Sequence, residues 1–294
     1  WEEEAWKHRK QHRTTWVNAS SAAGPYGLTV LPLICLDVDG TLVGLDGVPS
    51  AALWEAVDRA LARGQRLTLC TARLAAGPTR AWAERLDPDG WHVFHTGGAR
   101  WHPRTGEVRT APLDHSVVSG CVEVAEANGW VLEAYSWDDY VVDSDDRLAR
   151  DHARLLALPF VRRPLADLSD PIVRMQFVVP TSVAGAALAS APAGADASAA
   201  TSPVMPGATF VSITAVGVSK AAAVAAVAAD LDVAMSDVMM VGDGHNDLPA
   251  IEAVGWGVAM GNAEPEVRSA ARFTVADVDA GGAAEAIDRS AGLA

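Results

Sequence analysis

Two aspartates separated by one residue stand where an apolar run of the chain ends, in the segment Leu36-Asp37-Val38-Asp39-Gly40-Thr41. The apolar run over residues 31–36 suits a buried strand, and the glycine that follows suits a sharp turn. Gly40 lets the backbone approach a ligand closely, and Thr41 offers a hydroxyl group. A turn of this composition can hold a hard cation and attack an electrophile in the same place.

Other polar residues follow two more predicted strands and open one predicted helix. Thr71 follows a strand-like run over residues 66–70, and the segment Gly242-Asp243-Gly244-His245-Asn246-Asp247 follows another over residues 237–241. Lys220 comes directly after Ser219, a good helix N-cap, at the start of an alanine-rich run. Ligands of an open parallel sheet bind beyond the carboxyl ends of its strands, so these distant groups can converge.

The chemistry of these side chains favours Mg²⁺ and a phosphoryl group. Oxygen-only ligands suit Mg²⁺, which usually takes one or two carboxylates together with substrate phosphate. Neither an HExxH motif nor a Cys/His cluster of the zinc-binding kind occurs in the sequence. A phosphoryl group in transfer needs a cation, a lysine and amide or hydroxyl donors around it. Lys220 and the exposed amides at the start of its helix can supply such donors.

Strands and helices are expected to alternate in the parts of the chain that carry these residues. Ser50 precedes a run with Leu53, Val57 and Leu61 at four-residue spacing, and Gly64 follows it, which predicts a capped helix. The other expected elements are strands over residues 66–70, 91–95, 237–241 and 256–260, and helices over 78–86, 220–229 and 248–254. This alternation predicts a parallel sheet that is covered by helices on both faces.

The middle of the chain has a mixed pattern, and we predict an inserted second domain there. A helix is expected over residues 120–128, with strands over 131–135 and 172–179. The Ala, Ser, Pro and Gly tract over 187–206 suits a poor helix followed by a flexible loop. The strand-like run over 209–214 is assigned to the first domain. The predicted organisation is an N-terminal extension over 1–27, a first domain over 28–98 and 209–294, and an insertion over 99–208.

Composition excludes some classes of partner. The formal net charge is −14, and no long Lys/Arg run occurs, so neither nucleic acid nor an anionic membrane surface is an expected partner. No stretch is long and apolar enough to span a bilayer, and the charged first residues show no secretory signal. Cys35, Cys70 and Cys121 form no CxxC pair and suggest no disulfide framework, which favours a cytoplasmic location.

Taken together, the motifs resemble those of the haloacid dehalogenase-like (HAD) superfamily, and within it the Cof-type phosphatases that carry a large inserted cap. The resemblance covers roughly residues 31 to 290. The motifs also follow one another in the family's order and at its spacing, and the longest interval between them lies where the cap belongs. The matching positions are Asp37-Val38-Asp39-Gly40-Thr41, Thr71, Lys220, Gly242-Asp243-Gly244-His245-Asn246-Asp247 and, more weakly, Gly261-Asn262-Ala263.

The resemblance implies a role for each catalytic and phosphate-binding position. Asp37 would be the nucleophile that forms an aspartyl-phosphate. Asp39 would protonate the leaving oxygen and then activate the hydrolytic water. Thr71 and Lys220 would hold the phosphoryl oxygens, and Asn246 would contact the phosphoryl group or its surroundings.

The same resemblance implies a Mg²⁺ site. Asp243 would bind the ion together with the carboxylate of Asp37 and the backbone carbonyl of Asp39. Asp247 would support the metal-bound waters or orient Lys220.

Two positions depart from the family pattern. Ala72 follows Thr71 and Ala221 follows Lys220, at places where the family usually has glycine. Each change adds one methyl group near the phosphate, and neither removes a charged group. An active enzyme is therefore still expected.

Several other polar and aromatic residues allow more than one interpretation. His245 is interpreted as a loop histidine rather than a ligand. Trp137 and Tyr140 of the insertion are interpreted as turn or strand-edge residues, although contact with substrate is conceivable. Arg174 and Gln176 share one face of a predicted strand, where substrate contact and a solvated sheet face are equally open.

We therefore expect an α/β fold, with a doubly wound parallel sheet as the Rossmann-like core and an inserted α+β cap domain. The expected function is Mg²⁺-dependent hydrolysis of a small phosphomonoester, with a sugar phosphate as one candidate and a small phosphorylated metabolite as the partner. A phosphosugar mutase and a catalytically silent phosphate-binding module are the alternatives. The oligomeric state stays open.

Overall fold

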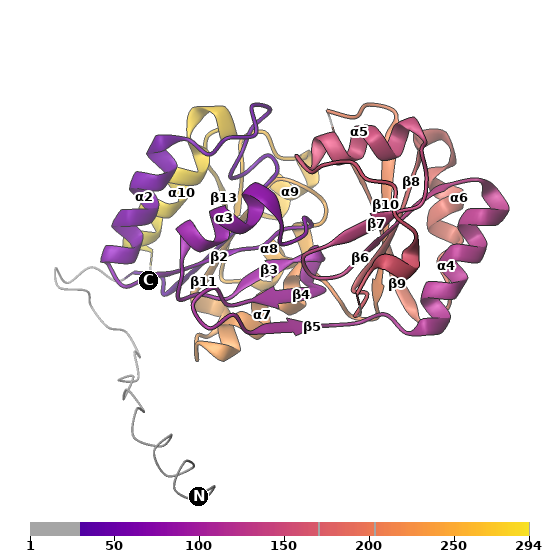
Figure 1. Cartoon of the computed structure of the whole chain (residues 1–294). Coiled ribbons are helices and arrows are strands. Elements are labelled where there is room, and N and C mark those ends of the chain that lie inside the picture. Colours follow the sequence, from indigo (N-terminus) through magenta and orange to yellow (C-terminus); the bar gives the residue numbers. More distant parts are fainter. Residues whose placement is uncertain (1–29, 170, 203, 294) are drawn as a thin grey trace, which may run out of the picture.

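The computed structural model describes residues 30–169, 171–202 and 204–293, and Figure 1 shows two lobes side by side. The predicted N-terminal extension over residues 1–27 lies outside the described residues. One lobe contains both ends of the described chain, and the other is built from its middle. In the part of the chain that the structure describes, every helix is too short or too polar to cross a membrane.

The first lobe is organised around a five-stranded parallel sheet in the order β13-β12-β11-β1-β2. The strands are β1 (Leu33–Leu36), β2 (Arg66–Leu69), β11 (Val238–Gly242), β12 (Trp256–Ala259) and β13 (Phe273–Thr274). Strand β1 lies in the middle, where Leu33 is in register with Arg66 on one side and with Val238 on the other. All residues of β1 and β11 are buried, as expected for central strands covered on both faces.

Helices cover this sheet (Figure 1). They are α2 (Ala51–Ala62), α3 (Gly77–Leu86), α7 (Lys220–Asp230), α8 (Leu248–Ala253), α9 (Pro265–Ala270) and α10 (Gly282–Arg289). The Ser50 hydroxyl caps α2 by accepting from the Leu53 amide at 3.2 Å, as the sequence predicts. Helix α2 packs on α10, and α7 packs on α8. The predicted α/β class with a doubly wound parallel sheet is confirmed.

A small antiparallel sheet extends the first lobe. It consists of β3 (His92–Phe94), β4 (Ala99–Trp101) and β5 (Val108–Thr110). It adjoins β2, because Val93 forms a parallel bridge with Cys70 and its carbonyl accepts from the Thr71 amide at 3.0 Å. Ala99 and Trp101 are buried in the core of the first lobe. The predicted start of the insertion at residue 99 is therefore wrong, since β4 and β5 remain with this lobe.

The second lobe contains a five-stranded antiparallel sheet in the order β7-β6-β8-β10-β9. Its strands are β6 (Val131–Tyr135), β7 (Tyr140–Val142), β8 (Arg174–Pro180), β9 (Ala195–Thr201) and β10 (Ala208–Ala215). Helices α4 (His115–Asn128) and α6 (Ala184–Ala189) cover one face, and α5 (Arg147–Leu155) packs on the other. We call this second lobe the cap.

Two predictions for the cap were wrong. Residues 209–214 belong to β10, which pairs with β8 and β9 of the cap, so the first lobe does not resume at residue 209. A strand pattern alone does not say which sheet a strand joins. The tract over 187–206, expected to end in a loop, contains the edge strand β9, which is mostly exposed. Its alanines and serines lack the β-branched side chains that signal a strand in sequence.

Candidate active site

The acidic turn after β1 is held by the backbone of the neighbouring strand. The Asp37 amide donates to the Val241 carbonyl at 3.0 Å, which continues the pairing of β1 with β11. Gly40 has a φ of +79°, in the left-handed region that glycine adopts most easily. A Cβ atom at this position would come within 2.0 Å of Oδ2 of Asp243. Glycine therefore lets the two acidic turns approach each other.

Lys220 lies between two of the predicted carboxylates. Its Nζ donates to Oδ1 of Asp37 and to Oδ1 of Asp247, each at 2.6 Å, and all three side chains are buried. The Ser219 hydroxyl caps α7 by accepting from the Ala222 amide at 3.1 Å, so Lys220 occupies the first position of the helix. Burial lowers the pKa of Lys220, but Asp247 and Asp37 raise it by more, so the ammonium stays charged.

Asp247 also organises the second acidic turn. Its Oδ2 accepts from the amides of Asp243 at 3.2 Å and Gly244 at 3.1 Å. A Cβ atom at Gly242 would lie 2.4 Å from Cγ of Asp247, so the carboxylate can fold back over the turn only beside glycine. Asn246 lies in the same turn with a half-buried side chain.

Three carboxylates meet here with a single lysine between them. Asp37, Asp243 and Asp247 each offer an oxygen within 4.8 Å of the other two. Burial and then repulsion from Asp247 raise the pKa of Asp37 to about 7, in spite of its ion pair with Lys220. Burial and the charge of Asp37 raise the pKa of Asp243 to about 8. The excess of negative charge and the oxygen-only donors fit a hard divalent cation.

Asn262 ties the two acidic turns together. Its Nδ2 donates to the Gly40 carbonyl at 2.8 Å and to Oδ2 of Asp243 at 3.3 Å. Its Oδ1 accepts from the Val278 amide at 2.9 Å. Sequence analysis gave Asn262 only as part of a weak motif, and the structure shows what this side chain holds in place.

Asp39 is placed differently from the other carboxylates. Its side chain is 59% exposed and forms a two-pronged ion pair with Arg73, from Nε at 2.9 Å and from Nη2 at 2.5 Å. Sequence analysis missed Arg73, although a basic residue two positions after Thr71 was a visible signal. The structure therefore brings Asp37, Asp243, Asp247 and Lys220 together, and turns the Asp39 carboxylate towards Arg73.

Thr71 lies at the end of β2 beside this cluster. Its side chain is buried, and its Oγ1 accepts from the Arg73 amide at 3.1 Å. The amide of the neighbouring Cys70 donates to the Leu36 carbonyl at 2.8 Å, which places the end of β2 beside the residue that precedes Asp37. The carboxyl ends of β1, β2 and β11 therefore meet, as expected for neighbouring parallel strands.

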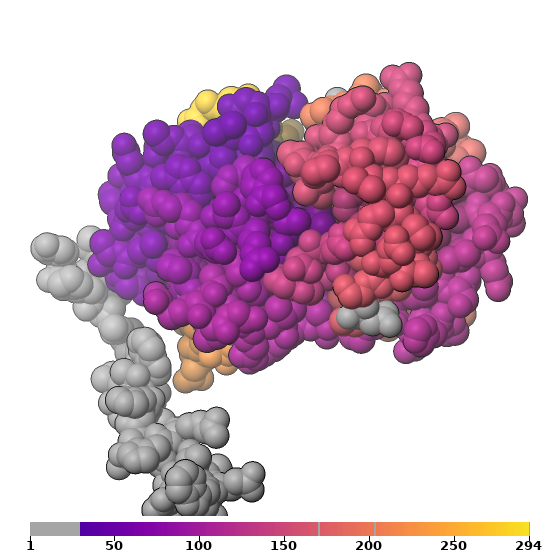
Figure 2. Space-filling model, viewed as in Figure 1, coloured from indigo at the N-terminus to yellow at the C-terminus, as the bar shows by residue number. Residues whose placement is uncertain are grey.

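The cap touches the first lobe next to this site. Nη1 of Arg174 donates to the Ala72 carbonyl at 2.5 Å. The Trp137 carbonyl accepts from the Ala75 amide at 3.1 Å and lies 3.1 Å from Nε2 of His95. Figure 2 shows a notch between the two lobes. Arg174 and Trp137 are thus residues of the contact between cap and first lobe.

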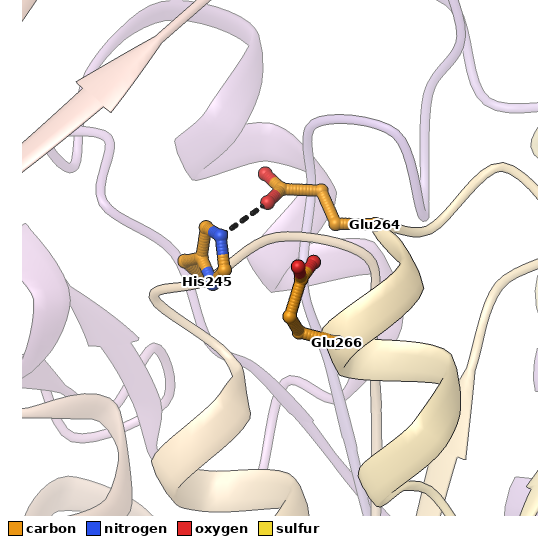
Figure 3. Close-up of side chains that lie close together, drawn as sticks. All are labelled: His245, Glu264 and Glu266. Atoms are coloured by element: carbon orange, nitrogen blue, oxygen red, sulfur yellow. Dashed lines mark ion pairs between the residues drawn. The ribbon is translucent and has the colours of Figure 1, made fainter.

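His245 lies outside the carboxylate cluster. Its Nε2 lies 2.6 Å from Oε2 of Glu264, and Glu266 is close by (Figure 3). These three side chains could in principle surround a cation, but all of them are exposed and water competes for each. The position of His245 agrees with its interpretation as a loop histidine.

Comparison with known proteins gives a match over most of the chain. The model of the haloacid dehalogenase-like hydrolase family matches residues 34–287. YxeH of Bacillus subtilis (strain 168) is 27% identical over 262 residues, 87% of this chain and 96% of that protein. The crystal structure of a haloacid dehalogenase-like hydrolase from Bacteroides thetaiotaomicron has 26% identity and a TM-score of 0.77, and covers 87% of this chain and 98% of that one.

Other curated relatives are more similar over shorter segments. A phosphoglycolate phosphatase of Methanothermobacter thermautotrophicus (strain ATCC 29096 / DSM 1053 / JCM 10044 / NBRC 100330 / Delta H) is 44% identical over 62 residues, 21% of this chain and 28% of that protein. The first three curated relatives match over 24%, 28% and 28% of their own length.

Proposed function

The chain belongs to the haloacid dehalogenase-like hydrolases, and from this premise we propose that it is a Mg²⁺-dependent phosphatase that hydrolyses a small phosphomonoester. A sugar phosphate is one candidate substrate. The name of the phosphoglycolate phosphatase supports a small phosphorylated metabolite, although that match is short. The observation that carries the proposal is the cluster of buried Asp37, half-buried Asp243 and buried Asp247, with Lys220 bound to the first and the last.

Asp37 is the proposed nucleophile. Its Oδ1 accepts from Lys220, which leaves the other oxygen free to attack phosphorus as the bond to the leaving oxygen breaks. The product is an aspartyl-phosphate and an alcohol. Lys220 and Thr71 are the proposed donors to the phosphoryl oxygens. Asn246, in the second acidic turn, is proposed to contact the phosphoryl group or its surroundings. Lys220 is positioned for this by its second hydrogen bond, to Asp247.

Asp39 is the proposed acid and base. It donates a proton to the leaving oxygen, and it then accepts a proton from the water that attacks the aspartyl-phosphate, which releases phosphate and regenerates Asp37. Asp39 is engaged by Arg73 in the described structure. Its carboxylate therefore has to leave Arg73 before it can reach the substrate.

The donor set fits Mg²⁺. The residues that would hold it are Asp37 and Asp243 through their carboxylates and Asp39 through its backbone carbonyl. Asp247 would support the metal-bound waters or orient Lys220. When bound, the ion would neutralise charge on the phosphoryl group and on the crowded carboxylates.

The test is Asp37→Asn, which keeps the shape of the side chain and removes the nucleophile. Release of inorganic phosphate from an aryl phosphate in the presence of Mg²⁺ should fall by roughly 10⁴-fold. Asp46→Asn, in an exposed loop nearby, is the matched control and should keep full activity. Full activity of the Asp37 variant would refute the assignment of the nucleophile. A second assay with a hexose phosphate separates a phosphatase, which releases inorganic phosphate, from a mutase, which returns the phosphoryl group to the sugar and forms an isomer.

A further inference from the structure

Arg174, the first residue of β8, is a buried cation that lacks a carboxylate partner. The residue is 3% exposed, and among the described residues its side chain donates a hydrogen bond to the neutral carbonyl of Ala72 alone. Its Nε is buried and has no hydrogen-bond partner, and no ion pair joins Arg174 to a carboxylate of residues 30–169, 171–202 or 204–293. A buried guanidinium normally needs such a partner, because removing its charge from water is costly.

Glu133, the carboxylate that neighbours Tyr135 in the cap, is already engaged by other groups. The Arg174 guanidinium lies 4.0 Å from the centre of the Tyr135 ring, and the Tyr135 hydroxyl donates to Oε2 of Glu133 at 2.5 Å. Glu133 also accepts from Gln176 at 3.0 Å and lies 2.8 Å from Nδ1 of His152. Both oxygens of Glu133 therefore accept hydrogen bonds from groups other than Arg174, whose charge acts on Glu133 only by lowering its pKa, and Arg174 keeps unused donors.

Arg174 is also close to the place where a phosphoryl group would bind. Ala72, whose carbonyl it contacts, directly follows Thr71 at the end of β2. Arg174 reaches this point from β8 of the cap, whereas Lys220 comes from α7 of the first lobe. A phosphoryl group held by Thr71 and Lys220 would direct the rest of the substrate towards the cap.

We propose that Arg174 binds a second anionic group of the substrate, a carboxylate or a second phosphate, in the part that leaves with the alcohol. This inference rests on the proposed phosphatase function and narrows its substrates to phosphomonoesters with a second negative charge. A planar guanidinium with free donors suits a carboxylate or a phosphate, and the Tyr135 ring fixes its plane. Such a charge-assisted contact should change kcat/KM by about 10- to 100-fold.

The test compares substrates that differ only in the second anion. 6-Phosphogluconate and sorbitol 6-phosphate carry the same phosphoryl group on the same carbon chain, and only the first has a carboxylate. Fructose 1,6-bisphosphate and fructose 6-phosphate form the second pair, which distinguishes a phosphate from a carboxylate. The native chain should prefer the anionic member of at least one pair by about tenfold or more in kcat/KM.

The variant Arg174→Gln should remove this preference, mainly by raising KM for the anionic substrate. Arg174→Lys keeps the charge and should restore part of the preference, which a purely structural role would not predict. The matched control is Arg150→Gln, an exposed arginine of the cap that contacts Asp145, and it should leave both members of each pair unchanged. Circular dichroism of each variant checks that the fold is kept.

Three results would overturn the inference. A native chain without preference in either pair has no second-anion site. If Arg174→Gln lowers kcat/KM equally for all substrates, Arg174 contacts the transferred phosphoryl group. If kcat/KM is unchanged for every substrate, Arg174 has no role in binding. If the native chain releases no phosphate from any substrate, the proposed function fails. Equilibrium titration of the same pairs then decides the inference by itself, with tighter binding of the anionic member expected.

Discussion

The three carboxylates of the first lobe and the single buried carboxylate Glu133 of the cap differ in how well their negative charge is balanced. In the first lobe, Asp37, Asp243 and Asp247 share Lys220, and the pKa values of Asp37 and Asp243 are raised to about 7 and about 8. In the cap, Glu133 is surrounded by hydrogen-bonding partners. Burial raises the pKa of Glu133, but the charge and hydrogen bond of His152 and the hydrogen bond of Tyr135 bring it below 4.5.

The carboxylates of the first lobe lack enough positive charge and suit a bound cation, whereas the hydrogen bonds of Glu133 in the cap come from the chain itself. In the cap, the Glu133 carboxylate has hydrogen-bonding partners in Tyr135, His152 and Gln176. These contacts stabilise the sheet and orient the side chains around Arg174. The cluster of the first lobe is short of positive charge and gains stability from anything cationic that enters it. Burial alone therefore does not identify a functional carboxylate. Burial together with a shortage of positive charge and hydrogen-bond donors around the carboxylate does.

Removing Lys220, the ion-pair partner of Asp37 and Asp247, should have the largest effect on stability. Lys220→Met leaves Asp37 and Asp247 buried without their ion pair. In the presence of a chelator, we expect the free energy of unfolding to fall by about 3–5 kcal/mol, measured by urea titration. Lys220→Arg keeps the charge and should lose less. Because Asp37 and Lys220 form an ion pair, the double variant Asp37→Asn/Lys220→Met should recover part of the free energy of unfolding that Lys220→Met loses. An unchanged stability of Lys220→Met would show that the carboxylates are not charged.

Supplying the missing positive charge should have a smaller, opposite effect. Mg²⁺ at about 100 times its Kd should stabilise the chelator-treated chain by about 2.7 kcal/mol, which thermal unfolding at several Mg²⁺ concentrations would measure. Asp243→Asn should abolish the shift, and Glu133→Gln should keep it. A shift that survives in Asp243→Asn would place the ion elsewhere.

The smallest effect should come from the cap cluster and should depend on pH. Glu133→Gln keeps the shape but loses the charge, and at pH 7 it should lower the free energy of unfolding by about 2 kcal/mol. The folded-state pKa of Glu133 is lowered, so its contribution is complete above 4.5 and is lost as the pH falls through the lower value in the folded chain. Urea titrations of both proteins should converge at acid pH. A difference that stays constant with pH would mean that the charge of Glu133 contributes nothing.

The strands and helices near the acidic turns could be predicted because their signals are local. Ser50 and Ser219 cap helices where the sequence placed caps, and the ends of β1, β2 and β11 follow apolar runs that are easy to recognise. The fold class follows from that alternation. The meeting of the acidic turns follows from the general rule about strand ends in parallel sheets.

Other features depend on contacts that no local pattern records. The turn of Asp39 towards Arg73 requires β1 and β2 to be neighbours. The membership of β10 in the cap depends on its partners β8 and β9, and Thr201 is the only β-branched residue of β9. The partners of Glu133 come from β6, β8 and α5, so its satisfied state could not be predicted from spacing. For the same reason, spacing in the sequence could not predict that Arg174 forms no ion pair with a described carboxylate.

The pairing of β1 with β11 has a consequence for biosynthesis. Asp37 is translated before Lys220, Asp243 and Asp247, and β1 can pair with β11 only after β11 has been made. A ribosome-bound fragment that ends within the cap contains the proposed nucleophile but neither Lys220 nor the second acidic turn. Any catalytic competence therefore begins only after synthesis has passed residue 247, and a fragment that ends earlier would carry an inert Asp37.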